Sequence, residues 1–390
     1  MCAERNEVLF VGRKAVVKIL VASRALPAHG GGGMEVAAWD LMSEWSASGH
    51  EVVGLTTPGS SGFSGAPFEV RVLPGVAGGY SEEWFRATVA AAEQIRPEVV
   101  FGVSAGAHEM VKSSAADVVT IMQAHGTSIE EARSALSSRS LSGVRHALGQ
   151  IPGMLRDWDR YPKYDALVAV GPGIAQAIKS YPRRARPTRL EIIENGISLP
   201  SPVPTDCTLP PLPFAAFVGR LSHDKGPDLA IEALKYWPGN LVIIGDGPFD
   251  RDLRERVARL GLGKRVNFFG RLSRPEISWV LSSACAVLAP SRRREGLPLV
   301  ALEALAAGLP LVTSQSVADT FGASRPTGIL VGGAEPRRIG ALLTDAEILV
   351  KSGRVRLPDT YTLEVSARRY IELFDELLTI KRRMSGGAAS

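Results

Sequence analysis

The 390-residue chain has few cysteines, no long uncharged apolar run and little net charge. Its three cysteines lie far apart in sequence, which argues against a disulfide framework or a cysteine metal site and favours a reducing compartment. The longest apolar stretch, residues 297–312, contains Glu303 and is shorter than the ~18 uncharged residues of a membrane span. The N-terminus has Glu4 and Glu7 where a signal peptide would be basic. We therefore expect a cytoplasmic protein without a membrane span.

The net charge of +5 comes from the C-terminal half of the chain. Residues 1–198 contain 20 basic and 20 acidic residues, whereas residues 199–390 contain 25 and 20. Part of the excess lies in the basic runs 292–294 and 381–383. A solvated surface is the simplest interpretation of these runs, and contact with an anionic ligand or a peripheral membrane surface is the alternative. Because no aromatic residues are interleaved with the arginines, a nucleic-acid-binding protein is a disfavoured rival from another functional class.

Short apolar, β-branched runs alternate with longer amphipathic stretches, which is typical of parallel βαβ units. A Pro-rich segment, residues 199–213, separates two such series. We predict an α/β protein with two Rossmann-like parallel-sheet domains, at residues 1–198 and 199–361, facing a central cleft, followed by a long helix and tail at 362–390. The expected strands are residues 16–21, 52–56, 99–103, 118–123 and 167–170 in the first series, and 214–218, 241–244, 266–269, 286–289 and 311–313 in the second.

Two motifs are suited to binding phosphate. Residues 30–33 are four glycines between a predicted strand and a predicted helix, where free backbone N–H groups and the helix dipole favour an anion. A dinucleotide fingerprint is not satisfied, because Glu35 or Val36 stands at its sixth position. After strand 214–218 come Arg220 and Lys225, a planar fork and a point charge that together suit a diphosphate.

Two carboxylates lie near the start of a predicted helix in the second series. Pro298 suits the first helical position and Gly308 a C-terminal cap, so Glu295 precedes the helix and Glu303 lies within it. Eight residues of helix would separate the carboxylates by about 12 Å, too far to share a proton or a metal ion. We expect them to contact different ends of one elongated ligand.

In order along the chain, several of these segments resemble the retaining glycosyltransferases of the GT4 family, which have a two-domain GT-B fold. The segments that carry the resemblance are residues 218–221 with Lys225-Gly226, 244–248, 266–272 and the spacing from Glu295 to Glu303. The glycine loop, residues 49–52 and the linker 194–198 extend the resemblance over most of the chain. Glu194 and Ser198 depart from the Pro-Asn-Gly-Ile-Asp linker usual in the family, and residues 170–172 depart from its Val-Ser-Glu-like turn.

The resemblance implies roles for the charged residues. Arg220 and Lys225 would clamp the donor diphosphate, Glu303 would accept hydrogen bonds from the ribose, and Glu295 would hold a hydroxyl of the sugar. His125, directly after a predicted strand, matches a pocket histidine near the reacting sugar; a strand-end histidine without a ligand is the alternative.

The resemblance also implies backbone contacts. Gly32 and Gly33 would approach the phosphates from the first domain, and Arg271 and Leu272 would line the base. The C-terminal helix would cross back to the first domain. The backbone N–H groups that would meet the sugar and phosphate belong to Gly296, Leu297, Pro298 and Leu299.

The implied function is retaining transfer of a sugar from a nucleotide diphosphate sugar to an acceptor hydroxyl. No cofactor is expected, and no metal, since Arg220 and Lys225 can neutralise the leaving group. The donor base, the donor sugar and the acceptor stay open, as does a place in glycoconjugate, glycolipid or natural-product biosynthesis. A sugar-nucleotide epimerase of GT-B-like fold is the alternative within the enzymes.

Overall fold

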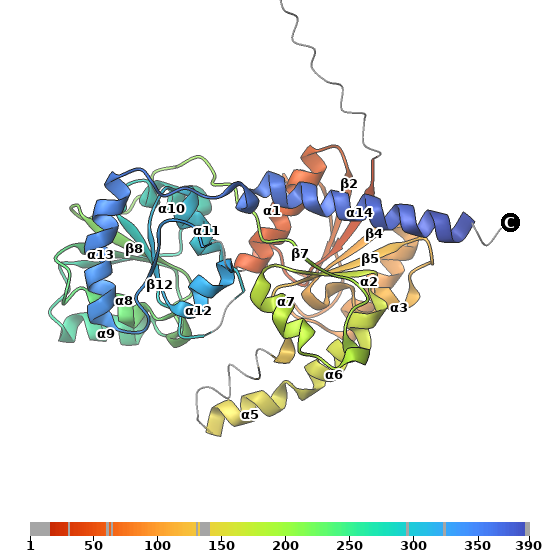
Figure 1. The fold of residues 1–390 in the computed structure, drawn as a ribbon, viewed down its shortest axis with the longest axis horizontal. Coiled ribbons are helices and arrows are strands. Elements are labelled where there is room, and N and C mark those ends of the chain that lie inside the picture. Colours follow the sequence, from red (N-terminus) through yellow and green to blue (C-terminus); the bar gives the residue numbers. More distant parts are fainter. Residues whose placement is uncertain are drawn as a thin grey trace, which may run out of the picture.

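The chain forms two parallel sheets, each covered by helices, in a computed structural model (Figure 1). The structure describes residues 16–386 except 30–31, 60–61, 64, 130–131, 133–140, 294–295 and 323–324. The second sheet lies in the left lobe of Figure 1 and the first in the right lobe. The chain returns from the left lobe to the right one just before α14 (Leu363–Gly386), which lies along the right lobe. Within the described ranges, every helix is too short or too polar to span a bilayer.

The first sheet has the strand order β3-β2-β1-β4-β5-β6-β7, and all neighbouring strands are parallel. Its strands are β1 (Lys18–Ala22), β2 (Glu51–Thr56), β3 (Glu69–Val72), β4 (Val99–Val103), β5 (Val119–Ala124), β6 (Ala166–Ala169) and β7 (Leu190–Ile192). The described helices of this domain are α1 (Gly33–Ala47), α2 (Glu82–Ile95), α3 (Met110–Ser113), α5 (Leu141–Gly149), α6 (Ile151–Arg160) and α7 (Pro172–Lys179).

The second sheet has the order β10-β9-β8-β11-β12-β13, which is the doubly wound arrangement. Its strands are β8 (Phe214–Val218), β9 (Asn240–Ile244), β10 (Val266–Gly270), β11 (Ala286–Ala289), β12 (Leu311–Thr313) and β13 (Ile329–Val331). Its helices are α8 (Pro227–Ala233), α9 (Asp250–Arg259), α10 (Arg274–Leu281), α11 (Leu299–Ala306), α12 (Gln315–Ala318) and α13 (Pro336–Lys351). The predicted fold class is confirmed.

All ten expected strands are present, within two residues at each end, and the structure adds β3, β7 and β13. These three unpredicted strands all lie at an edge of a sheet. An edge strand is covered on one side only, and most residues of these three are half-buried or exposed. They therefore lack the continuous apolar run that marks a buried parallel strand in sequence.

Helix α14 packs on the first domain, as the resemblance implies. Its apolar face includes Tyr370 and Phe374, which lie in one core cluster with strand residues such as Phe101. Trp45 of α1 packs edge-on against Phe101, Tyr370 and Phe374, and its indole Nε1 donates to the Ala367 carbonyl at 3.2 Å. The end of the chain thus completes the core of the first domain.

The chain passes between the domains twice, and the two passages lie side by side. Ile197 and Thr362 form a parallel bridge, with Ile197 N–H donating to Tyr361 O and Leu363 N–H donating to Ile197 O. A Cβ on Gly196 would collide with the backbone at Thr362 and Leu363, so only glycine fits there. The departure at Glu194 has a structural reason, because its carboxylate pairs with Arg369 of α14 at 2.6 Å.

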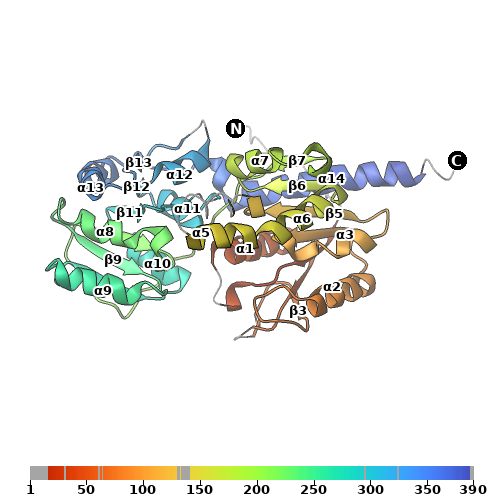
Figure 2. The ribbon, with the colours of Figure 1, turned by 90° about the horizontal axis from the view of Figure 1, so that it is seen from below.

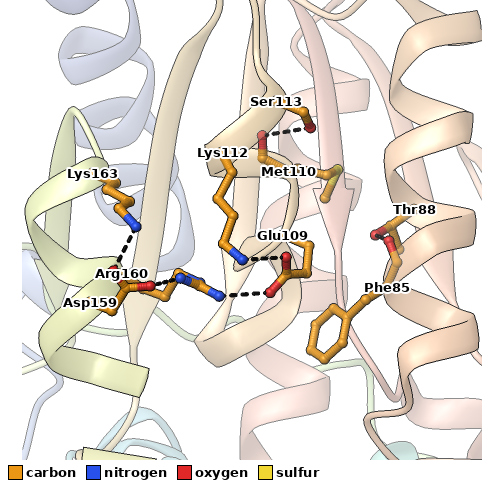
Figure 3. Close-up of polar contacts among 9 residues, drawn as sticks. All are labelled: Phe85, Thr88, Glu109, Met110, Lys112, Ser113, Asp159, Arg160 and Lys163. Carbon is orange, nitrogen blue, oxygen red and sulfur yellow. Dashed lines mark hydrogen bonds and ion pairs between the residues drawn. The ribbon is translucent and has the colours of Figure 1, made fainter. Parts of the chain in front are cut away.

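Charged side chains join α3 to α6 on the first domain (Figure 3). Glu109 accepts from Arg160 at 2.9 Å and from Lys112 at 2.7 Å, while Asp159 pairs with Lys163 at 2.7 Å and also contacts Arg160. The Arg160 side chain is only 11% exposed, so these ion pairs compensate for its burial. The network stabilises helix packing in the first domain.

Candidate functional site

The strand orders locate the place where a ligand should bind. In each sheet the order reverses direction at one point, between β1 and β4 and between β8 and β11, and open α/β sheets bind ligands outside the strand ends at such points. Gly32 and Gly33 follow β1, and Gly33 is the first residue of α1. Arg220 follows β8. The two predicted phosphate motifs therefore lie at the reversal points of the two sheets.

The loops after β8, β9 and β10 pack on one another in the second domain. Gly219 N–H donates to Ile244 O, and Gly245 N–H donates to Gly270 O. Gly245 has φ +130°, and a Cβ there would collide with the carbonyl of Gly219, so only glycine allows this close approach. Arg220 is exposed at this edge.

Arg271 and Leu272, predicted to line a base, follow β10. The Arg271 Nε donates to Asp246 Oδ2 at 2.7 Å, and both side chains are more than half exposed. Leu272 packs partly buried against the core cluster that contains α11. Their predicted contact with a base remains a prediction.

The turn that contains Lys225 is held by the loop after β11. Arg292 N–H and the Ser291 hydroxyl both donate to Asp224 O, and Arg292 forms a bidentate pair with Asp228 at 2.7 Å for each bond. Burial would raise the pKa of Asp228, but the hydrogen bonds and charge of Arg292 outweigh it and lower the pKa. Arg292, from the basic run 292–294, is thus engaged inside the domain.

The other basic run is also engaged within the chain. Lys381 pairs with Asp165 at 3.0 Å and donates to Val118 O, and Arg382 pairs with Glu98 at 2.9 Å. These contacts anchor the end of α14 to the first domain.

Helix α11 presents its N-terminus to the site. The structure corrects one detail, because Pro298 is the N-cap and the helix begins at Leu299; the extended ψ of 133° at Pro298 keeps it outside the helix. Gly308, with φ +72°, follows the C-cap as predicted. Leu297 is buried, and Glu303 is half-buried. Glu295 lies outside the described residues.

Glu303 lies near an ion pair that joins the two domains. Asp40 of α1 accepts from Arg274 of α10 at 2.9 Å, and Arg274 also donates to Ser198 O at 3.1 Å. Burial raises the pKa of Glu303. The positive charge of Arg274 lowers this pKa and the negative charge of Asp40 raises it, and the overall shift is upward. Sequence reasoning missed Asp40 and Arg274, and no local motif marks either residue.

The domains meet where the predicted phosphate and sugar contacts lie. A Cβ built on Gly33 would be 3.3 Å from Leu299 Cγ, and one built on Gly296 would be 3.1 Å from the His125 carbonyl oxygen. Figure 2 shows α1 and α11 at this junction. Residues from the two domains, Gly33 and His125 on one side and Gly296 and Leu299 on the other, are thus brought together.

His125 follows β5 and is half-buried. Its Nε2 lies 2.8 Å from Gln123 Oε1, and burial lowers its pKa to about 4. The ring is therefore neutral near pH 7. Sequence reasoning also missed Ser104, which follows β4. Its φ of +51° is rare for a residue other than glycine and marks backbone strain at the end of the strand.

Two stretches of the sequence have the Asp-x-Asp spacing found in some metal sites, Asp157 to Asp159 and Asp250 to Asp252. Asp157 lies in α6 and accepts from Tyr181, and Asp250 lies in α9 and accepts from Arg254. Residues two apart on a helix point in different directions, so neither pair can chelate one ion. Across the described ranges, no three His, Cys, Asp or Glu side chains gather as metal ligands.

Comparison with known protein families gives two matches, one in each half of the chain. Residues 31–200 match the family described as Glycosyltransferase Family 4, and residues 210–347 match Glycosyl transferases group 1. The chain is also 34% identical over 167 residues to D-inositol 3-phosphate glycosyltransferase of Mycobacteroides abscessus, covering 38% of this chain. It spans 36% of the length of that relative.

Solved structures resemble the whole chain at low sequence identity. Sucrose-phosphate synthase from Thermosynechococcus elongatus is 18% identical with a TM-score of 0.75, covering 93% of this chain and 99% of that one. The Anabaena protein HepE in complex with UDP-glucose is 17% identical with a TM-score of 0.62, covering 96% and 99%. At these identities the likeness concerns the fold alone.

Proposed function

Because the chain belongs to the group 1 glycosyltransferases of family GT4, we propose that it transfers a sugar, with retention, from a nucleoside diphosphate sugar to an acceptor hydroxyl. The observation that carries the proposal is the meeting of Gly33 with Leu299 and of His125 with Gly296 across the domain junction. A ligand held there contacts a helix N-terminus from each domain, which suits a diphosphate that links two different groups.

Each part of the donor has a candidate partner. Arg220 and Lys225 hold the diphosphate, Glu303 accepts from the ribose, and Glu295 accepts from a sugar hydroxyl. The half-buried position of Glu303 beside Arg274 supports its role, because a carboxylate there needs donors that a diol supplies. UDP-glucose, bound to HepE, is the first donor to test.

The chemistry requires negative charge on the leaving diphosphate to be stabilised. The bond from the sugar C1 to the diphosphate oxygen breaks, and C1 forms a bond to the acceptor oxygen on the same face. The acceptor proton goes to the leaving phosphate, so no separate base is required. The main contribution of the chain is electrostatic stabilisation by Arg220, Lys225 and the N–H groups at the start of α11.

A panel of nucleotide sugars, scored for slow hydrolysis without acceptor, tests the proposal. We expect one donor to release free sugar with its anomeric configuration retained, and the Lys225→Ala variant to lose this activity. Release of a nucleotide sugar or free sugar epimerised at another carbon would favour the epimerase alternative. Absence of turnover and of binding across the panel would refute the proposal.

A further inference from the structure

A buried line of hydrogen bonds connects α14 to His125. Gln123 lies on β5, two residues before His125, and is completely buried. Its Nε2 donates to the hydroxyl of Tyr370 on α14 at 3.0 Å, and its Oε1 lies 2.8 Å from His125 Nε2. Tyr370 is also completely buried. Both polar atoms of the Gln123 side chain therefore have a hydrogen-bond partner, and its oxygen is the partner of His125.

The amide oxygen of Gln123 determines which ring nitrogen of His125 bears the proton. A carbonyl oxygen only accepts, so the nitrogen facing it must donate. A neutral imidazole has one N–H, and burial keeps this ring neutral near pH 7 by lowering its pKa to about 4. With the proton on Nε2, the other nitrogen, Nδ1, has a lone pair and accepts a hydrogen bond.

Tyr370 binds the other end of the amide. The donor end of Gln123 points to the Tyr370 hydroxyl, which leaves the oxygen end for the histidine. The ring of Tyr370 is held in turn, because it packs with Trp45, Phe101 and Phe374 in the core. The tautomer of His125 thus depends on a helix far away in sequence.

We propose that Gln123 is a positioning residue that holds His125 as the Nε2–H tautomer, so that Nδ1 accepts a hydrogen bond from a hydroxyl of the sugar at the domain junction. The proposal rests on the proposed function for the identity of that sugar. It is placed at the junction because the backbone carbonyl oxygen of His125 lies against Gly296, in the loop before α11. The opposite tautomer would present an N–H and would require the hydroxyl to accept.

The tautomer can be measured directly, without any substrate. The chain has six histidines, and ¹⁵N spectra of ring-labelled protein at pH 7, compared with the His125→Phe variant, identify the signals of His125. We expect one protonated nitrogen, Nε2, in the wild-type protein. Gln123→Met, which keeps the length but removes both polar ends, should give a mixture of tautomers. Gln123→Glu, which keeps an acceptor, should retain Nε2–H.

Tyr370→Phe supplies a second variant that keeps the packing of the ring. Without the hydroxyl the amide loses the contact that orients it, so we expect the Nδ1–H form to appear here as well. Gln176→Met, at an exposed glutamine of α7, is the matched control and should leave the spectrum unchanged. An Nδ1–H tautomer in the wild type, or Gln123→Met and Tyr370→Phe spectra identical to the wild type, would overturn the proposal.

Kinetics with the donor found in the hydrolysis panel provide the second readout. Gln123→Met should lower kcat/KM about tenfold, the effect of losing one hydrogen bond of ordinary strength. In a His125→Phe background the same change should have no further effect, whereas a purely structural role would lower activity in both backgrounds. An equal loss in both backgrounds refutes the positioning role. If no donor reacts with the wild type, the proposed function fails while the tautomer result stands by itself.

Discussion

The pair between Asp228 and Arg292 should be among the strongest charged contacts of the second domain. Asp228 is in α8, just after the turn that contains Lys225, and its side chain is 6% exposed, whereas the side chain of Arg292 is 25% exposed. Replacing Asp228 with Asn removes one charge and leaves the guanidinium with a neutral partner. Breaking a buried pair in this way costs about 3–5 kcal/mol.

The expected loss is smaller here because Arg292 is partly exposed. Water reaches part of its guanidinium, and its bond to His223 O at 2.7 Å persists. We therefore expect Asp228→Asn to lower the free energy of unfolding of the second domain by about 2–3 kcal/mol. For a domain of this size that corresponds to a decrease in Tm of roughly 5–10 °C.

The pH dependence has a definite sign. The pKa of Asp228 is lower in the folded than in the unfolded chain. Its contribution is therefore fully present above the unfolded pKa, about 3.9, and is lost as the pH falls through the folded pKa. The difference in unfolding free energy between wild type and Asp228→Asn should be constant from pH 7 to pH 5 and should shrink only below about pH 4.

Urea unfolding monitored at several pH values measures this difference. Glu255→Gln is the matched control, because its pair with Arg251 at 2.9 Å is exposed and should contribute only about 0–0.5 kcal/mol. The reasoning would be refuted by an Asp228→Asn variant as stable as Glu255→Gln at pH 7. A cost that shrank already between pH 7 and pH 5 would also contradict it.

Three further sets of substitutions test the site and the fold. Arg220→Ala and Lys225→Ala should each lower turnover of the donor by roughly 10²–10³-fold with an unchanged Tm; a folded Lys225→Ala variant with normal turnover would exclude the diphosphate clamp. Glu303→Gln should weaken binding of the free nucleoside diphosphate in calorimetry, whereas Glu295→Gln should reduce transfer more than nucleotide binding; equal losses of nucleotide affinity would contradict separate contacts. Phe374→Ala should destabilise the first domain by about 3–5 kcal/mol in urea unfolding, compared with no measurable change for the exposed Met384→Ala.

The fold could be predicted from the sequence wherever burial acts on continuous segments. Strands such as Val99–Val103 and Phe214–Val218 are buried by helices on both faces, so they appear as unbroken apolar runs and were predicted with correct bounds. The edge strand Leu190–Ile192 has only half-buried residues and gives no such run. Its pairing with β6 is determined by the neighbouring strand and not by its own composition.

The site could be predicted only where its residues belong to local motifs. Arg220 and Lys225 follow a strand and lie within a few residues of each other, so their placement follows from the βα unit that contains them. Asp40 and Arg274 are 234 residues apart, and Gln123 and Tyr370 are 247 residues apart. Contacts of this kind depend on how the two domains and α14 pack, which no pattern within a single segment specifies.

The two segments that connect the domains lie side by side, and this arrangement limits how the domains can move relative to each other. Residues near Ile197 and Thr362 form the only pair of neighbouring backbone segments by which the described chain passes between the sheets. Relative motion is then easiest as a rotation about this line, because any sliding would break the bonds from Ile197 to Tyr361 and Leu363. Such a rotation would separate Gly33 from Leu299 and His125 from Gly296. It would leave Tyr370, Gln123 and His125 together, since Gln123 bonds to both and all three pack in the first domain. We therefore expect the arrangement of His125 to be the same in an open and a closed form of the protein.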